Sequence, residues 1–168
     1  MKSFKFIRIF IVSLLLFLTI GCDQASKVFI RGSLDYNEQI EFFGRHFIIT
    51  KVENTGAFLS FGDSLPILIK VFIFMILPGI FIALGLLFAV LKKDIQNLKL
   101  AGLCLILGGG IGNVFDRIAF GSVTDFLHIN FGFIKTGIFN LADFFVMVGA
   151  FMILLKSVPM PLGKFSVR

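Results

Sequence analysis

Four stretches of this 168-residue chain are apolar enough and long enough to cross the hydrocarbon core of a membrane. A membrane-spanning helix needs about 20 predominantly apolar residues. We place these spans near residues 7–30, 65–91, 98–118 and 138–155. Only 15% of all residues are charged, against about 25% in ordinary globular domains. The sequence therefore predicts an integral membrane protein, mainly α-helical, with four transmembrane helices in a single domain over residues 1–168.

The positive charges are concentrated on one side of the predicted spans. Nine basic residues and the single acid Asp94 fall on that side, whereas the rest of the chain carries seven basic and nine acidic residues. The nine are Lys2, Lys5, Arg8, Lys92, Lys93, Lys99, Lys156, Lys164 and Arg168. Cytoplasmic loops are enriched in Lys and Arg, so both termini are predicted to be cytoplasmic. No basic stripe interleaved with aromatics accompanies the net charge of +6, and we expect no nucleic-acid partner.

The two segments on the opposite side differ in character. Residues 36–62 contain short runs of β-branched and aromatic residues bounded by Gly and Asn, which is typical of strands. We expect a small sheet on the outer membrane surface. Residues 119–137 are punctuated by Gly and rich in aromatics, and we predict a loop or short interfacial helix there.

The first 22 residues also have the pattern of an export signal. A basic start and an apolar core are followed by a lipobox-like string that ends at Cys22. In that alternative the chain would be cleaved and become a lipid-anchored protein. Three further apolar spans follow, and a mature lipoprotein is usually one soluble domain. We therefore favour an uncleaved first span.

Two carboxylates lie where a bilayer makes a charge expensive. Asp143 begins the fourth predicted span, and Asp125 follows the end of the third by about seven residues. An Asp at membrane depth costs roughly 2.5–3.5 kcal/mol even on lenient scales, so it usually marks function. Two neighbouring carboxyl groups that share a proton can activate water against an amide carbonyl. This pattern indicates an aspartyl protease; helix capping by Asp143 and a loop position for Asp125 are the structural alternatives.

Further polar residues accompany the same ends of the spans. Asp23 and Lys27 are four residues apart, hence on one helix face, and a surface ion pair with a snorkelling lysine is the simpler interpretation. Asn54 and Gly56 follow the predicted strands and are typical turn residues.

A glycine-rich run from Gly108 to Gly112 precedes three polar residues of the third span. Such a run weakens a helix unless another backbone packs closely against it. Asn113, Asp116 and Arg117 then project from adjoining helix faces. Helix packing with a buried Asp116–Arg117 network is the structural alternative, and it leaves Asn113 unexplained.

The sequence gives no indication of a metal or cofactor. His46 and His128 are the only histidines, and Cys22 and Cys104 lie in apolar stretches without metal-ligand spacing. A hard cation held by the carboxylates of Asp116, Asp125 and Asp143 is the remaining alternative. A different function is also an alternative: a small transporter or proton-conducting protein, because intramembrane carboxylates also form proton relays. A relay would spread its ionisable groups over the membrane depth, whereas these lie in the outer third.

Five sequence blocks together resemble the lipoprotein signal peptidase family, the type II signal peptidases. They are Asp23-Gln-x-Ser-Lys27, Asn54-x-Gly-Ala57, Gly109-Gly-x-Gly-Asn113-x-x-Asp-Arg117, Gly121-x-Val-x-Asp125-Phe126 and Phe139-Asn140-x-Ala-Asp143. They occur in this order over residues 23–143, and the combination is highly specific. Three departures from the family pattern occur: Phe58-Leu59 after the second block, Thr124 in place of an aliphatic residue, and the bulky Phe144. We expect these to alter the walls of the pocket.

The resemblance implies a four-helix fold with an outer β-cradle and an extracytoplasmic loop or helix over the active site. It implies an aspartic endopeptidase of the bacterial inner membrane that needs no metal. The enzyme would remove the signal peptide of diacylglyceryl-modified prolipoproteins before the lipidated Cys and be inhibited by globomycin-type peptides. Its catalytic pair would be Asp125 and Asp143. The supporting residues would be Asp23, Lys27, Asn54, Gly56, Asn113, Asp116, Arg117 and Asn140.

Overall fold

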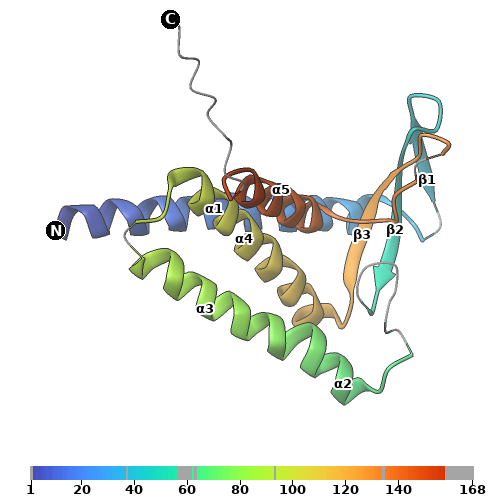
Figure 1. Ribbon diagram of the computed structural model, residues 1–168. Helices are drawn as coiled ribbons and strands as arrows, with labels where there is room; N and C mark the ends of the chain where they lie inside the picture. The colour runs from blue at the N-terminus through green and yellow to red at the C-terminus, as the bar shows by residue number, and fades with distance from the viewer. Residues whose placement is uncertain are drawn as a thin grey trace, which may run out of the picture.

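The computed structural model describes residues 2–36, 38–56, 62, 64–92, 94–133 and 135–157. Figure 1 shows a set of helices with a small sheet at one end. The elements are α1 (Lys2–Ser33), β1 (Gln39–Phe42), β2 (Phe47–Asn54), α2 (Ile67–Val71), the π-helical turn η2 (Phe72–Ile76), α3 (Leu77–Leu91), α4 (Asn97–Phe120), β3 (Val123–Ile129) and α5 (Leu141–Leu155). Some residues used in the motif and charge predictions lie outside the described residues: Ala57, Phe58, Leu59, Lys93, Lys164 and Arg168.

Three helical segments of the described chain are long and apolar enough to cross a membrane. They are Phe6–Ser33, Ile67–Leu91 and Asn97–Phe120, and the apolar helix α5 is shorter. Their outer surfaces expose large apolar side chains such as Phe81 and Phe151, whereas Asp23 and Lys27 are completely buried. Apolar residues outside and paired polar groups inside are expected where the solvent is lipid. The prediction of a mainly helical integral membrane protein is confirmed.

Helix α5 begins three residues later than the predicted span. Phe139 donates its backbone N–H to the Leu127 carbonyl and accepts from Leu127 N–H, at 2.9 and 2.7 Å. These bonds extend the backbone beside β3, so helix formation starts only after Asn140. At about 1.5 Å per residue, the 15 residues of α5 are shorter than the roughly 30 Å hydrocarbon core.

Helices α2, η2 and α3 form one continuous segment with a π-helical turn inside it. The turn ends at Ile76, and Pro78 follows in the first turn of α3. Proline has no N–H to donate and its ring crowds the carbonyl four residues earlier. Widening the preceding turn relieves this crowding, as π-turns inside α-helices do.

The glycines of α4 allow α5 to pack against it at backbone distance. A Cβ at Gly109 would collide with the carbonyl oxygen of Ala142, and one at Gly102 would lie 2.6 Å from that of Gly149. A Cβ at Gly110 would touch only the Ile82 side chain, at 3.4 Å. The expectation that the glycine-rich run permits a close backbone approach is confirmed. This contact places the first turn of α5 beside the polar half of α4.

The three strands form one antiparallel sheet in the order β1-β2-β3. Figure 1 shows it where α1 and α4 end and α5 begins, with its strands running across the direction of α1. In its register Val52 lies opposite Asp125 and Glu53 opposite Thr124. The ladder is irregular between Ile49 and Val52. The sheet therefore places Asp125 at the end of the helix bundle.

The prediction of a loop or short helix for residues 119–137 is wrong over residues 123–129, which form β3. Gly121 ends α4 with a φ of +76°, a left-handed conformation that glycine adopts readily. Val123, Thr124 and Phe126 favour extended structure, and β2 offers them a ladder of hydrogen-bond partners. Pairing with a strand some 70 residues away thus decides the conformation of this segment.

Candidate active site

Asp125 lies on β3 with both carboxylate oxygens held by amide side chains. Asn54 at the end of β2 donates to Oδ2 at 2.9 Å, and Asn140 donates to Oδ1 at 2.6 Å. Only 4% of Asp125 is exposed. The pKa of Asp125 is raised from 3.8 to about 6, mainly by burial and in part by the charge of Asp143, while the hydrogen bonds from Asn54 and Asn140 lower it. The environment therefore favours a protonated carboxyl group in the mildly acidic range.

Asp143 is fixed in the first turn of α5. Its Oδ1 accepts a hydrogen bond from Asn113 Nδ2 at 2.8 Å, and its Oδ2 accepts from the Asn140 backbone N–H at 3.3 Å. Asn140 in turn accepts from the Asp143 N–H at 3.0 Å, which completes a capping box. The structure therefore confirms that Asp143 takes part in capping the start of α5. The same cap aims its carboxylate at the cavity that Asp125 also lines.

One small cavity of about 40 Å³ joins the two carboxylates. It is lined by Asn54, Asn113, Arg117, Val123, Asp125, Asn140 and Asp143. Larger cavities flank it: one of about 320 Å³ beside Asp125 and one of about 530 Å³ beside Asp143. Room for one water needs roughly 10–15 Å³ on this measure, so the small cavity suffices for a reacting water.

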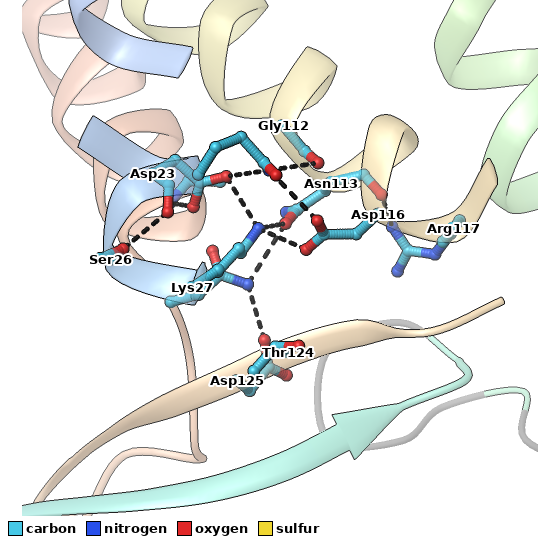
Figure 2. A network of polar contacts seen from close by, with 12 residues as sticks. Asp23, Ser26, Lys27, Gly112, Asn113, Asp116, Arg117, Thr124 and Asp125 are labelled. Carbon is cyan, nitrogen blue, oxygen red and sulfur yellow. Dashed lines mark hydrogen bonds and ion pairs between the residues drawn. The ribbon is translucent and has the colours of Figure 1, made fainter. Parts of the chain in front are cut away.

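A buried ion cluster lies behind the carboxylates, between α1 and α4 (Figure 2). Lys27 is completely buried, and its Nζ is 2.8 Å from carboxylate oxygens of both Asp23 and Asp116. Gln24 donates to the same two carboxylates at 3.0 and 3.1 Å. The predicted Asp23–Lys27 pair is therefore present, but the snorkelling interpretation is wrong. The ammonium group is instead buried between two carboxylates, where each charge has a partner.

The cluster contacts the first turn of α5 directly. Asp23 accepts a hydrogen bond from the Ala142 backbone N–H at 2.9 Å, which satisfies one of the free donors at that helix start. Lys27 donates to Asn113 Oδ1 at 3.0 Å. Because an ammonium group can only donate, this bond orients the Asn113 amide with its NH₂ group toward Asp143. Asp23 and Lys27 thus set the surroundings of Asp143 without lining the cavity.

Arg117 supports the loop that follows β2. Its Nη2 donates to the Gly56 carbonyl at 2.7 Å and its Nη1 to the Asn113 carbonyl at 3.3 Å. The Gly56 N–H donates to Asn54 Oδ1 at 3.0 Å, so Asn54 presents its NH₂ group to Asp125. The structural alternative of an Asp116–Arg117 network is wrong. Neighbouring residues of a helix point about 100° apart, and Asp116 faces α1 while Arg117 faces the sheet.

The structure thus brings all ten predicted site residues to one end of the bundle. It also shows three residues that the sequence did not single out: Gln24, Arg31 and Glu53. Arg31 follows Asp23 and Lys27 at further four-residue steps, so helical spacing was a usable signal. No sequence signal pointed to Glu53, because its partners lie about 70 residues away in the chain. Thr124, expected to alter the pocket wall, instead lies completely buried between Arg31 and Glu53.

Among the described residues, no group of three or more His, Cys, Asp or Glu side chains is arranged to hold a metal ion. Within that part of the chain both cysteines are free, with Cys22 exposed and Cys104 buried. Independence from metals stays a prediction.

A model of the signal peptidase (SPase) II family matches residues 15–159 of the chain. The chain belongs to the signal peptidase II family. Signal peptidase II is a protease, and the membrane-spanning helices agree with a bacterial membrane protein of this class.

Several proteins named lipoprotein signal peptidase resemble the chain over most of its length. The protein of Borrelia hermsii is 34% identical over 140 residues, which are 80% of this chain and 81% of its relative. That of Geobacter sulfurreducens is 35% identical over 129 residues, 76% and 78% of the two chains. That of Neisseria meningitidis serogroup C is 34% identical over 136 residues, 81% and 82% of the two chains.

Two solved structures of bacterial membrane enzymes share the fold. One has a TM-score of 0.79 and 23% identity, and covers 94% of this chain and 93% of the other. The second has a TM-score of 0.75 and 22% identity, and covers 88% and 92%. The arrangement of helices and sheet therefore recurs in these two membrane enzymes.

Proposed function

We propose that the chain is an aspartic endopeptidase that removes the signal peptide from diacylglyceryl-modified prolipoproteins, immediately before the lipidated Cys. The observation that carries the proposal is the small cavity that Asp125 and Asp143 line together. Membership of the signal peptidase II family supports the reaction class. The names of the relatives support lipoproteins as the substrates.

The chemistry that we propose uses one proton shared between the two carboxyl groups. Burial, the largest cause, and the charge of Asp143 raise the pKa of Asp125, so we assign the shared proton to Asp125 and the role of base to Asp143. The ionised group takes a proton from the water in the cavity, and the water attacks the scissile carbonyl. The protonated carboxyl group polarises that carbonyl and later gives its proton to the leaving amine. The amides of Asn54, Asn113 and Asn140 hold both groups in place throughout.

The flanking cavities suit a substrate with an apolar part. The cavity beside Asp143 is lined mainly by apolar side chains, among them Phe139, Val146 and Met147. Phe144 and Met147 are also exposed on the outer face of α5, where lipid covers the protein. A lipid-modified peptide can therefore approach Asp143 from the bilayer without transferring its acyl chains through water.

The location that we propose is the bacterial inner membrane, with both termini in the cytoplasm and the active site toward the outer face. The charge distribution of the loops supports this orientation. Prolipoproteins, membrane lipids and globomycin-type peptide inhibitors are the proposed partners.

The test is a gel-shift cleavage assay with the purified protein and a diacylated prolipoprotein, with and without a globomycin-type peptide. Asp125→Asn and Asp143→Asn should each abolish cleavage, because an amide can neither take the proton of water nor supply one to the carbonyl. Asp94→Asn changes the charge equally at the opposite end of the helices and serves as the matched control, with unchanged turnover. Near-wild-type turnover of either dyad variant would show that the residue is not catalytic.

A further inference from the structure

The face of β3 opposite the cavity carries a second polar arrangement. Val123 and Asp125 line the cavity, and neighbouring strand residues point to opposite faces. Thr124 therefore points away from the cavity, and its side chain is completely buried. A buried hydroxyl group costs free energy unless it is hydrogen-bonded, so its partners decide what holds this part of the strand.

Thr124 lies between two opposite charges. Arg31 Nε donates to the Thr124 hydroxyl oxygen at 2.7 Å, and that hydroxyl donates to Glu53 Oε1 at 2.8 Å. We call these three residues the Arg31–Thr124–Glu53 bridge. Each end of it is charge-assisted, and such hydrogen bonds are roughly twice as strong as neutral ones.

The bridge joins the sheet to the helix bundle. Arg31 extends from the last turn of α1, its Nη2 is 3.2 Å from Asp116 Oδ1, and its guanidinium lies 3.9 Å from the centre of the Phe120 ring of α4. Glu53 belongs to β2 and directly precedes Asn54, which donates to Asp125. The Thr124 hydroxyl group thus connects β3, which carries Asp125, and β2, which leads to Asn54, to Arg31 of α1.

We propose that the Arg31–Thr124–Glu53 bridge fixes the position of Asp125, with Thr124 as a positioning residue for the cleavage reaction. Thr124 holds β3 on one face while the Asp125 carboxylate faces the cavity on the other. The inference rests on the proposed catalytic role of Asp125. It adds that this role depends on a contact on the far side of the strand.

The loss of rate that we expect follows from how little displacement a reacting group tolerates. A displacement of about 1 Å in a reacting group can cost about 100-fold in rate. Thr124→Val keeps the shape of the side chain but leaves the Arg31 N–H and one Glu53 oxygen without their shared partner. We expect β3 to shift and to admit water around Asp125.

The experiment compares three variants in the prolipoprotein cleavage assay. Thr124→Val should lower kcat at least about tenfold with KM nearly unchanged, because the positioned group acts on the reaction and not on substrate binding. Thr124→Ser keeps the hydroxyl group and should recover kcat to within about threefold of wild type. Ser122→Ala is the matched control: Ser122 donates to the other Glu53 oxygen at 2.6 Å but does not contact Arg31. It should lower the melting temperature comparably and leave kcat unchanged.

The pH profile supplies a readout that a purely structural role would not move. Burial is the main reason that the pKa of Asp125 is raised to about 6. Water admitted by the shift of β3 lowers that pKa, so the limb of the rate profile that depends on it should move to lower pH in Thr124→Val. Hydrogen exchange of the β3 amides should become faster in the same variant.

Unchanged kcat and pH profile in Thr124→Val would overturn the inference, as would an equal loss of kcat in Ser122→Ala. If Thr124→Val is not recovered folded, Glu53→Met replaces it, because methionine removes the oxygen that accepts the Thr124 hydrogen bond, and its kcat should fall in the same way. The outcome is distinguishable from a failure of the proposed function. If Asp125→Asn still cleaves, the proposed function fails; if Asp125→Asn is inactive and Thr124→Val is fully active, only the bridge fails.

Discussion

The two carboxylates of the site differ in the groups that surround them. Asp125 is nearly enclosed, and its oxygens face the side-chain amides of Asn54 and Asn140. Asp143 lies in the first turn of a helix, where the free backbone N–H groups favour a negative charge. The two carboxyl groups therefore have different hydrogen-bond partners, which for Asp125 are side-chain amides and for Asp143 include the backbone at a helix start.

The raised pKa of Asp125 predicts how this residue affects stability. An aspartate in an unfolded chain has an ordinary pKa of 3.8, whereas the pKa of Asp125 in the folded protein is about 6. Between these values the folded state binds more protons than the unfolded state, so the free energy of unfolding falls as pH rises. We expect the titration of Asp125 to lower the free energy of unfolding by about 3 kcal/mol as the pH rises from about 4 to above 6.

The measurement is the free energy of unfolding in detergent, for wild type and Asp125→Asn, over that pH range. The variant lacks the titrating group, so the difference between the two curves isolates Asp125 from the other acids. The free energy of unfolding of Asp125→Asn, relative to that of wild type, should increase as the pH rises. Parallel curves would contradict the raised pKa.

Arg117 should behave differently from the proposed catalytic pair, Asp125 and Asp143. Its guanidinium spans two acceptors, the carbonyls of Gly56 and Asn113. Lysine keeps the charge but has no planar fork, so Arg117→Lys can satisfy only one of them well. We expect cleavage to fall roughly tenfold without being abolished, together with a lower melting temperature. Cleavage rate and melting temperature are measured together. If both are unchanged in Arg117→Lys, Arg117 does not support the site in this way.

At the scale of the element, the α4–α5 contact decides where Asp143 lies. Gly109 packs against the backbone of Ala142, the residue before Asp143. Asp23 binds the N–H of the same residue from α1. The first turn of α5 is therefore confined from two sides, by backbone contact and by a buried hydrogen bond.

Two adjacent glycines allow a matched test of this confinement. Gly109→Ala places a methyl group against the Ala142 carbonyl, which is backbone and cannot turn aside. We expect a loss of about 1–3 kcal/mol in stability, as for other overpacked cores, and a clear loss of cleavage. Gly110→Ala meets only the end of the Ile82 side chain and should be tolerated. Equal behaviour of the two variants would show that the close approach does not matter.

At the scale of the whole molecule, the sheet and the turn between α3 and α4 lie at opposite ends of the helices (Figure 1). The positive-inside pattern predicts that the turn is cytoplasmic and the sheet extracytoplasmic. Two positions report on this: Gln96 before α4 and Arg45 in the turn between β1 and β2.

Single cysteines at these positions, in a chain with Cys22 and Cys104 replaced by Ala, allow labelling with an impermeant thiol reagent. Arg45→Cys should be labelled in intact spheroplasts, and Gln96→Cys only after the membrane is opened. Labelling of both from the same side would overturn the proposed topology.

The sequence by itself determined the class of the fold and pointed to the candidate residues of the site. Long apolar runs have no stable alternative to membrane helices, because lipid cannot hydrogen-bond an open backbone. Polar residues at the ends of those runs are too costly to be incidental, which singled out Asp125 and Asp143. The glycine-rich run predicted a close helix contact from the sequence alone, because only glycine lets two backbones approach so closely.

Tertiary structure alone decided which groups face each other. That Asp125 lies on a strand depends on β2, and that Asp116 pairs with Lys27 and not Arg117 depends on where α1 packs. The bridge through Thr124 depends on both at once. These contacts join residues about 70 to 90 positions apart, and local sequence preference carries no information about such pairings. They form because each buried polar group must find a partner, and the packed helices determine which partner is within reach.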